Sequence, residues 1–308
     1  MAFLGLMLRS GRRHRWRSWL ALTLLTAVVV GLVLAGVQTA RRTATAFPRF
    51  EAAHGYDTFF YSLNQLSRSQ SLSLPGVASA TVLTSVGTGS PTCDRCKPID
   101  VNNFTLSEVP PDRLAHYVKL VSGRLPNQSD PDEILASDNL TAFGVHVGSI
   151  VRVPLTAASQ RQAMLNSANI KAAGAVVKLH VVGLSVSEIE FPTTSSAPSY
   201  NLYTTQSFAT RYNPSTVLLY EYFFQLRRGA ARLVQFDAAA RNAGGLAPTD
   251  LHGLDTAITT SIEPQAVGWW ILTGLAALVG IIVLAQALAR QTVVEADDYP
   301  TLDRKSVV

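Results

Sequence analysis

Two long apolar blocks frame the chain, at residues 18–40 and 266–289. Neither block contains a charged residue, and each is long enough to cross the ~30 Å hydrocarbon core of a bilayer as a helix of about 20 residues. Trp269 and Trp270 stand at the start of the second block, where aromatic side chains favour the membrane interface. We therefore predict one transmembrane helix in each block.

The first block also has features of a cleaved signal peptide, with a basic segment before it and small residues near Ala35 and Gly36. A signal peptide usually has an apolar core of about 7–15 residues, and this block is longer. This difference favours a retained membrane helix. A secreted binding domain is the alternative, and the second apolar block argues against it.

Residues 41–265 alternate short β-favouring runs with polar turns, a pattern that predicts a mixed domain. An amphipathic helix is expected after residue 228, because Leu233, Phe236 and Ala240 recur at spacings of three and four. The membrane helix is expected to extend past residue 40 with a break near Pro48. Few βαβ repeats are present, so we predict an α+β domain. Strands are expected within residues 56–63, 74–91, 101–106, 133–136, 150–155 and 175–186 and at the starts of 199–212 and 216–245, with a short capped helix ending near Gly144.

Basic residues predict the orientation of the chain. Five arginines precede the first block, and such clusters favour the cytoplasmic side. Residues 1–17 are then a cytoplasmic, basic segment, with a short helix expected on the inner membrane surface. Residues 41–265 become extracytoplasmic, and the chain returns through 266–289. The net charge of +5 lies largely in this N-terminal flank and indicates contact with anionic lipids, not nucleic acid.

Candidate chemistry is sparse. Cys93 and Cys96 predict a local disulfide on the external side, with two free thiols as the alternative. None of the six histidines has a partner at a metal-ligand spacing, and neither a GxSxG nor a GxxxxGK[ST] motif is present. We therefore predict no catalytic, cofactor-binding or metal-binding residue in this chain.

The stretch from 123 to 153 carries a family resemblance. It has a G-R-x-P turn, an acidic turn, E-I-L, a short helix and a G-x-x-V-G step before a strand. This order resembles the extracytoplasmic core of MacB/FtsX-type ABC transporter permeases, and "RRTATAFPRF" after the first block fits a bacterial branch of them. The structural markers are Gly123, Arg124, Pro126, Glu133, Gly148 and Gly183.

The resemblance implies a bacterial plasma-membrane permease subunit with both termini cytoplasmic. In such systems a separate cytoplasmic ATPase binds ATP, and two permease copies or homologues assemble in the membrane. Residues 290–302 would form the cytoplasmic coupling segment. On this segment the resemblance implies ATPase contacts by Arg290, Gln291, Glu295, Asp298 and Tyr299.

The sequence departs from the family at its end. Residues 303–308, "DRKSVV", do not fit the family pattern, and we interpret them as a non-native tail on a truncated gene. Further membrane helices that the family uses are absent from the sequence given. A two-helix receptor or assembly regulator, with an external binding domain and no ATPase, is the alternative function.

Overall fold

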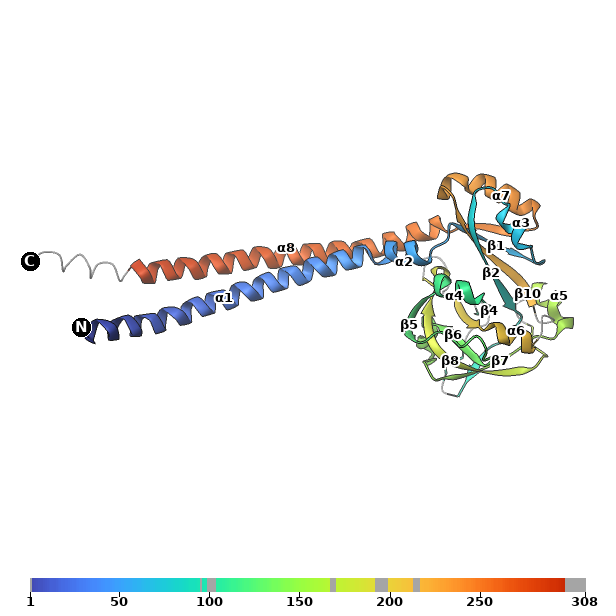
Figure 1. The fold of residues 1–308 in the computed structure, drawn as a ribbon, viewed down its shortest axis with the longest axis horizontal. Helices are drawn as coiled ribbons and strands as arrows, with labels where there is room; N and C mark the ends of the chain where they lie inside the picture. Colours follow the sequence, from blue (N-terminus) through green and yellow to red (C-terminus); the bar gives the residue numbers. More distant parts are fainter. Residues whose placement is uncertain are drawn as a thin grey trace, which may run out of the picture. The chain divides into compact units, whose positions relative to one another are not determined.

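The computed structural model describes residues 2–94, 96–98, 104–166, 170–191, 199–212 and 217–296. The chain divides into two units. Unit 1 holds Met1–Ala46 and Thr260–Val308, and unit 2 holds Phe47–Thr259. Unit 1 is helical, whereas unit 2 contains the sheet (Figure 1).

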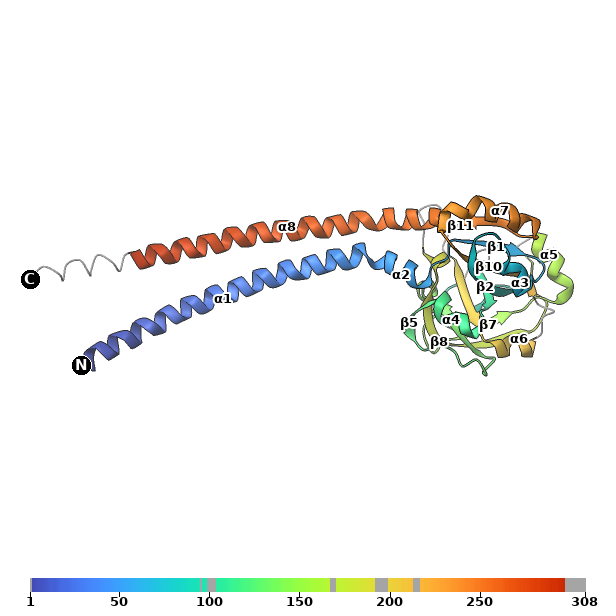
Figure 2. The same ribbon diagram turned by 45° about the horizontal axis from the view of Figure 1, so that its top comes forward.

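Unit 1 is an antiparallel pair formed by α1 (Ala2–Ala44) and the larger part of α8 (His252–Ala296), as Figures 1 and 2 show. The helices approach closely at two contacts, one at a glycine of each helix, and the contacts are seven residues apart along both helices. A Cβ on Gly36 would overlap Thr273, and a Cβ on Gly280 would overlap Val29. Small residues at such contacts let membrane helices pack backbone to backbone.

Both helices are long and apolar enough to cross a membrane. The most apolar 18-residue stretches of the candidate spans Leu20–His54 and His252–Arg290 have mean hydropathies of 2.6 and 2.4. Many of their large apolar side chains are exposed, among them Leu24, Ile271 and Ile281. Exposed apolar surface of this extent suits lipid rather than water. The predicted arrangement, two such helices flanking an α+β domain, is confirmed.

The start of α1 differs from the prediction. The sequence predicts a separate short helix before residue 18, whereas α1 continues without a break from Ala2. Leucine, methionine and arginine are good helix formers, and no proline interrupts them. The predicted interruption of the helix near Pro48 is present, but it lies at Thr45, between α1 and α2. The proline falls in the first turn of α2 (Ala46–His54), where its missing N–H costs no hydrogen bond.

The sheet of unit 2 has the strand order β11-β1-β10-β2-β4-β9-β6-β8-β7-β3, with β5 also paired to β8. Most neighbours are antiparallel, but β4–β9 and β6–β8 are parallel. The sheet is thus mixed, as an α+β domain predicts. The strands are β1 (Thr58–Ser62), β2 (Val77–Val86), β3 (Thr92–Cys93), β4 (Phe104–Glu108), β5 (Lys119–Gly123), β6 (Glu133–Ser137), β7 (Ile150–Pro154), β8 (Val176–Val186), β9 (Tyr200–Thr204), β10 (Val217–Leu226) and β11 (Leu246–Asp250).

The helices of unit 2 are short. The predicted helix at 138–144 is a 3₁₀ helix, η2, and Ser137 precedes it without a side-chain cap. Gly144 ends it in the left-handed conformation, with φ +95°, which glycine adopts without strain. The others are α3 (Arg68–Leu72), α4 (Pro111–Tyr117), α5 (Arg161–Asn166), α6 (Gln206–Tyr212), α7 (Leu233–Asn242), η2 (Asp138–Phe143), η3 (Ala158–Gln160), η4 (Glu188–Glu190) and η6 (Gly229–Arg232).

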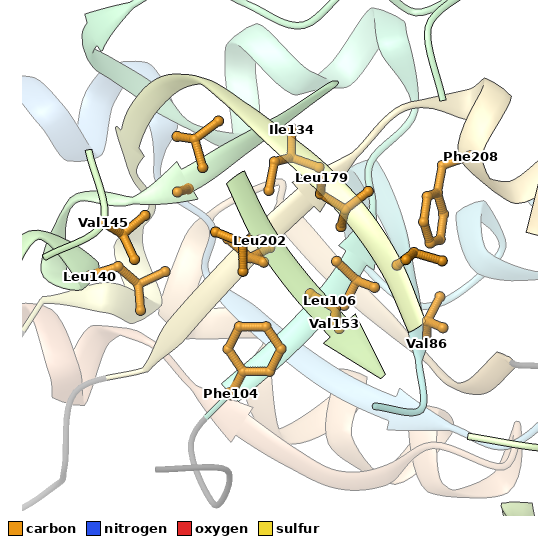
Figure 3. Packing of buried hydrophobic residues seen from close by; sticks show 14 of the residues in the cluster. Val86, Phe104, Leu106, Ile134, Leu140, Val145, Val153, Leu179, Leu202 and Phe208 are labelled. Atoms are coloured by element: carbon orange, nitrogen blue, oxygen red, sulfur yellow. The ribbon is translucent and has the colours of Figure 1, made fainter. Parts of the chain in front are cut away.

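Buried side chains hold the sheet together in neighbouring clusters. Figure 3 shows one of them, in which Leu106, Ile134 and Leu202 from three strands are fully buried. A second cluster joins β1 and β10 to α7, where Phe236 and Ala240 are fully buried as the amphipathic pattern predicts. These apolar contacts supply the main free energy that stabilises the domain.

Candidate functional site

The family markers meet in the turn between β5 and β6. Gly123 has φ +77° and lies opposite Gly183 of β8. The guanidinium of Arg124 pairs with the carboxylate of Glu133 through both of its terminal nitrogens, with Nη1 to Oε2 at 2.7 Å. The backbone N–H of Asn127 also donates to Glu133, at 2.7 Å. Hydrogen bonding to Arg124 lowers the pKa of Glu133, so this pair persists at neutral pH.

The two remaining markers are close to the same turn. Pro126 is buried. The backbone N–H of Gly148 donates to Val181 of β8 at 2.8 Å, and its φ is +90°. The motif residues therefore form a tight junction between β5, β6 and β8, where they stabilise the fold.

A second feature is the joint between α2 and the sheet, formed by residues 187–191. Phe191 makes edge contacts with Phe47 and Phe50 of α2, with ring centroids 5.4 Å and 4.9 Å apart. Both α2 rings are buried. These contacts fix α2 on the sheet within unit 2. We call residues 187–191 the joint segment.

Glu190 anchors the joint segment inside the domain. Its side chain is 1% exposed and accepts from Asn201 Nδ2 at 2.8 Å, from the Tyr203 hydroxyl at 2.7 Å and from the Ser187 N–H at 2.7 Å. Burial raises the pKa of Glu190 to about 7, against the effect of these donors. The other acid of this segment, Glu188, accepts from the Tyr56 N–H at 2.8 Å, and burial raises its pKa to about 9.

The predicted coupling residues lie at the end of α8. Arg290 is an exposed residue of the helix. Gln291 and Glu295 belong to the same helix, which ends at Ala296. Asp298 and Tyr299 lie outside the described residues, as does the tail 303–308. The coupling segment stays a prediction.

The two cysteines form a disulfide, with Cα atoms 5.2 Å apart. The loop that they close carries Asp94, whose carboxylate pairs with Arg152 of β7 at 2.5 Å. The loop is thereby tied to the edge of the sheet where β3 pairs with β7.

Comparison with known proteins finds similarities to solved structures of transporter and permease domains. No protein-family model matches the chain, and no curated protein matches it. A permease-protein domain from Porphyromonas gingivalis is 16% identical with a TM-score of 0.34, covering 61% of this chain and 82% of that one. The extracellular domain of the noncanonic ABC-type transporter YknZ from Gram-positive bacteria is 11% identical with a TM-score of 0.33, covering 63% and 98%. The periplasmic region of MacB from Actinobacillus actinomycetemcomitans is 13% identical with a TM-score of 0.37, covering 68% and 95%.

Proposed function

We propose that this chain is a permease-type subunit of the MacB/FtsX class, which carries the motion of a separate cytoplasmic ATPase to an extracytoplasmic domain. The observation that most supports this proposal is the continuity of α8. Its first turns belong to unit 2, where Ile258 is 3% exposed, and it runs without a break to Ala296. A 45-residue helix is about 67 Å long, more than twice the thickness of a bilayer core.

The second connection supports the same function. α1 leads through α2 into the domain, and the buried rings of Phe47 and Phe50 fix α2 on the joint segment. In this proposal, displacement of α8 reaches buried side chains of unit 2 along one helix, and displacement of α1 reaches them through the turn at Thr45 and α2. In this proposal the N-terminus and residues 290–302 are cytoplasmic, residues 41–265 are outside, and the ATPase binds ATP.

Co-purification tests the proposal. The full chain is expected to retain an ABC ATPase encoded beside its gene when both are extracted in mild detergent. A double charge reversal, Arg290→Glu with Glu295→Lys, should lower the retained ATPase about tenfold, because contacts between charged groups across an interface turn repulsive. The matched control reverses an external ion pair, Arg211→Glu with Asp132→Lys, and should retain the ATPase.

Failure would point to the alternative. If the folded wild-type chain retains no ATPase under conditions in which the ATPase itself is soluble and active, the permease proposal is wrong. A two-helix receptor or assembly regulator would then be the better account, because it needs the same anchors and no motor.

A further inference from the structure

Acidic side chains and one histidine converge where α2 meets the first turn of α8, inside unit 2. One ligand atom from each of Glu51, His252 and Asp255 lies within 4.8 Å of the other two. Glu188 of the joint segment lies near Asp255, because burial and then the charge of Asp255 raise its pKa. We call these four residues the α2–α8 cluster. Its members come from three separate segments of the chain.

The cluster contains buried carboxylate oxygens without a donor. Glu188 is 3% exposed and Asp255 is 7% exposed. Among the described residues, both side-chain oxygens of Asp255 and Oε1 of Glu188 have no hydrogen-bond partner. Burial raises the pKa of both Glu188 and Asp255, and the charge of Glu51 adds to the rise, so the three carboxyl groups lie close together. Buried charges of one sign are costly unless a proton or a cation neutralises them.

His252 is the one imidazole side chain within 4.0 Å of the Asp255 carboxylate among the described residues, with Nδ1 3.8 Å from Oδ2. Its other nitrogen, Nε2, lies 3.0 Å from Oδ1 of Asp57, although the angle does not qualify as a hydrogen bond. Nε2 is therefore turned toward Asp57, and Nδ1 is the ring nitrogen on the side of Asp255. The ring thus presents Nδ1 to the cluster.

We propose that Glu51, His252 and Asp255 bind a divalent cation of the Zn²⁺ type, with the unpartnered oxygen of Glu188 beside it. Zn²⁺ binds imidazole nitrogen and carboxylate oxygen atoms, usually with four ligands, whereas Ca²⁺ takes six to eight oxygen ligands. The bound ion joins α2 to the first turn of α8. This inference does not depend on ATPase coupling.

Calorimetric titration of the full chain tests the site. The chain is purified in detergent without a histidine tag, stripped with EDTA under non-reducing conditions, and titrated with ZnCl₂. We expect one Zn²⁺ per chain, and a rise in thermal midpoint because the ion binds the folded state. Glu51→Gln and His252→Gln should each weaken binding at least about tenfold. The matched controls Asp112→Asn and His146→Gln, at exposed positions outside the cluster, should bind as the wild type does.

The variants keep the test decisive. Glu51 is only partly buried, so Glu51→Gln should fold even if a change at Asp255 does not. Absence of Zn²⁺ binding by the folded wild type overturns the proposal. So does Zn²⁺ binding that is unchanged in Glu51→Gln, or a site that prefers Ca²⁺ and survives His252→Gln.

Discussion

Valine in place of Gly183 is expected to destabilise the external domain by about 3 kcal/mol, at the upper end of overpacking effects. A Cβ at this position would overlap the carbonyl oxygen of Arg124 and approach Leu135 Cδ2 at 2.7 Å. The carbonyl belongs to backbone that cannot yield as a flexible side chain does, because the Arg124 N–H is bonded to Val182 at 3.0 Å. The β5–β8 pairing must therefore separate to admit the methyl groups.

Urea unfolding of the full chain, followed by the near-ultraviolet circular dichroism of the domain's tyrosines, measures this loss. Gly253→Ala is the control, because a Cβ there meets nothing within 4 Å and lies in the first turn of α8. The control should match or exceed the wild type, since alanine favours helix by up to about 1 kcal/mol. An unchanged midpoint for Gly183→Val would show that the junction is not tightly packed.

Glutamine in place of Glu221 is expected to stabilise the domain by about 2 kcal/mol at pH 8 and to have little effect at pH 4.5. Glu221 is 5% exposed in β10, and the one donor to it among the described residues is the Ser85 hydroxyl. Burial raises its pKa from 4.5 to about 7. Each unit of such a difference corresponds to about 1.4 kcal/mol.

The sign follows from the bound protons. Below about pH 4.5 both folded and unfolded chains carry the proton, so this group contributes nothing. Between pH 4.5 and 7 the unfolded state releases the proton and the folded state keeps it, so stability falls as pH rises, and the loss levels off above pH 7. Glutamine at position 221 removes this contribution to the change of the free energy of unfolding with pH. The contribution of Glu190 remains.

Urea midpoints at pH 4.5 and pH 8 test the prediction, with Asp112→Asn as an exposed control whose slope should match the wild type. A Glu221→Gln variant that is destabilised equally at both pH values would mean that the carboxylate is better solvated than its burial indicates.

Local patterns predicted the elements that depend on local sequence. The apolar blocks became α1 and α8, and the spacing of Phe236 and Ala240 placed the buried face of α7. The order of the strands and the two parallel pairs were not predicted, because they join segments far apart in the chain. Every residue of β5 is exposed, so this strand lacks the alternation that marks a half-buried strand. β11 contains Pro248, which is tolerated because β11 lies at the edge of the sheet.

The two candidate sites also differ in whether their residues are close together in the sequence. The marker turn was visible because Gly123, Arg124 and Glu133 are close in sequence. The α2–α8 cluster had no spacing signal, since Glu51 lies near the start of the domain and His252 near its end. Only the fold that brings both ends of the domain together reveals it. The sequence prediction of no metal ligand considered local spacing alone.

The central claim is that ATPase motion reaches the helices of unit 1, and a nucleotide-dependent distance between those helices tests it most directly. Spin labels at Ala44→Cys and Glu263→Cys occupy exposed positions on α1 and α8, and the native cysteines are joined in a disulfide and stay unlabelled. Pulsed electron paramagnetic resonance is recorded on the complex with its ATPase, in ADP and in ATP with vanadate. The account predicts two distinct distance distributions. Identical distributions, with the ATPase bound and turning over ATP, would contradict it.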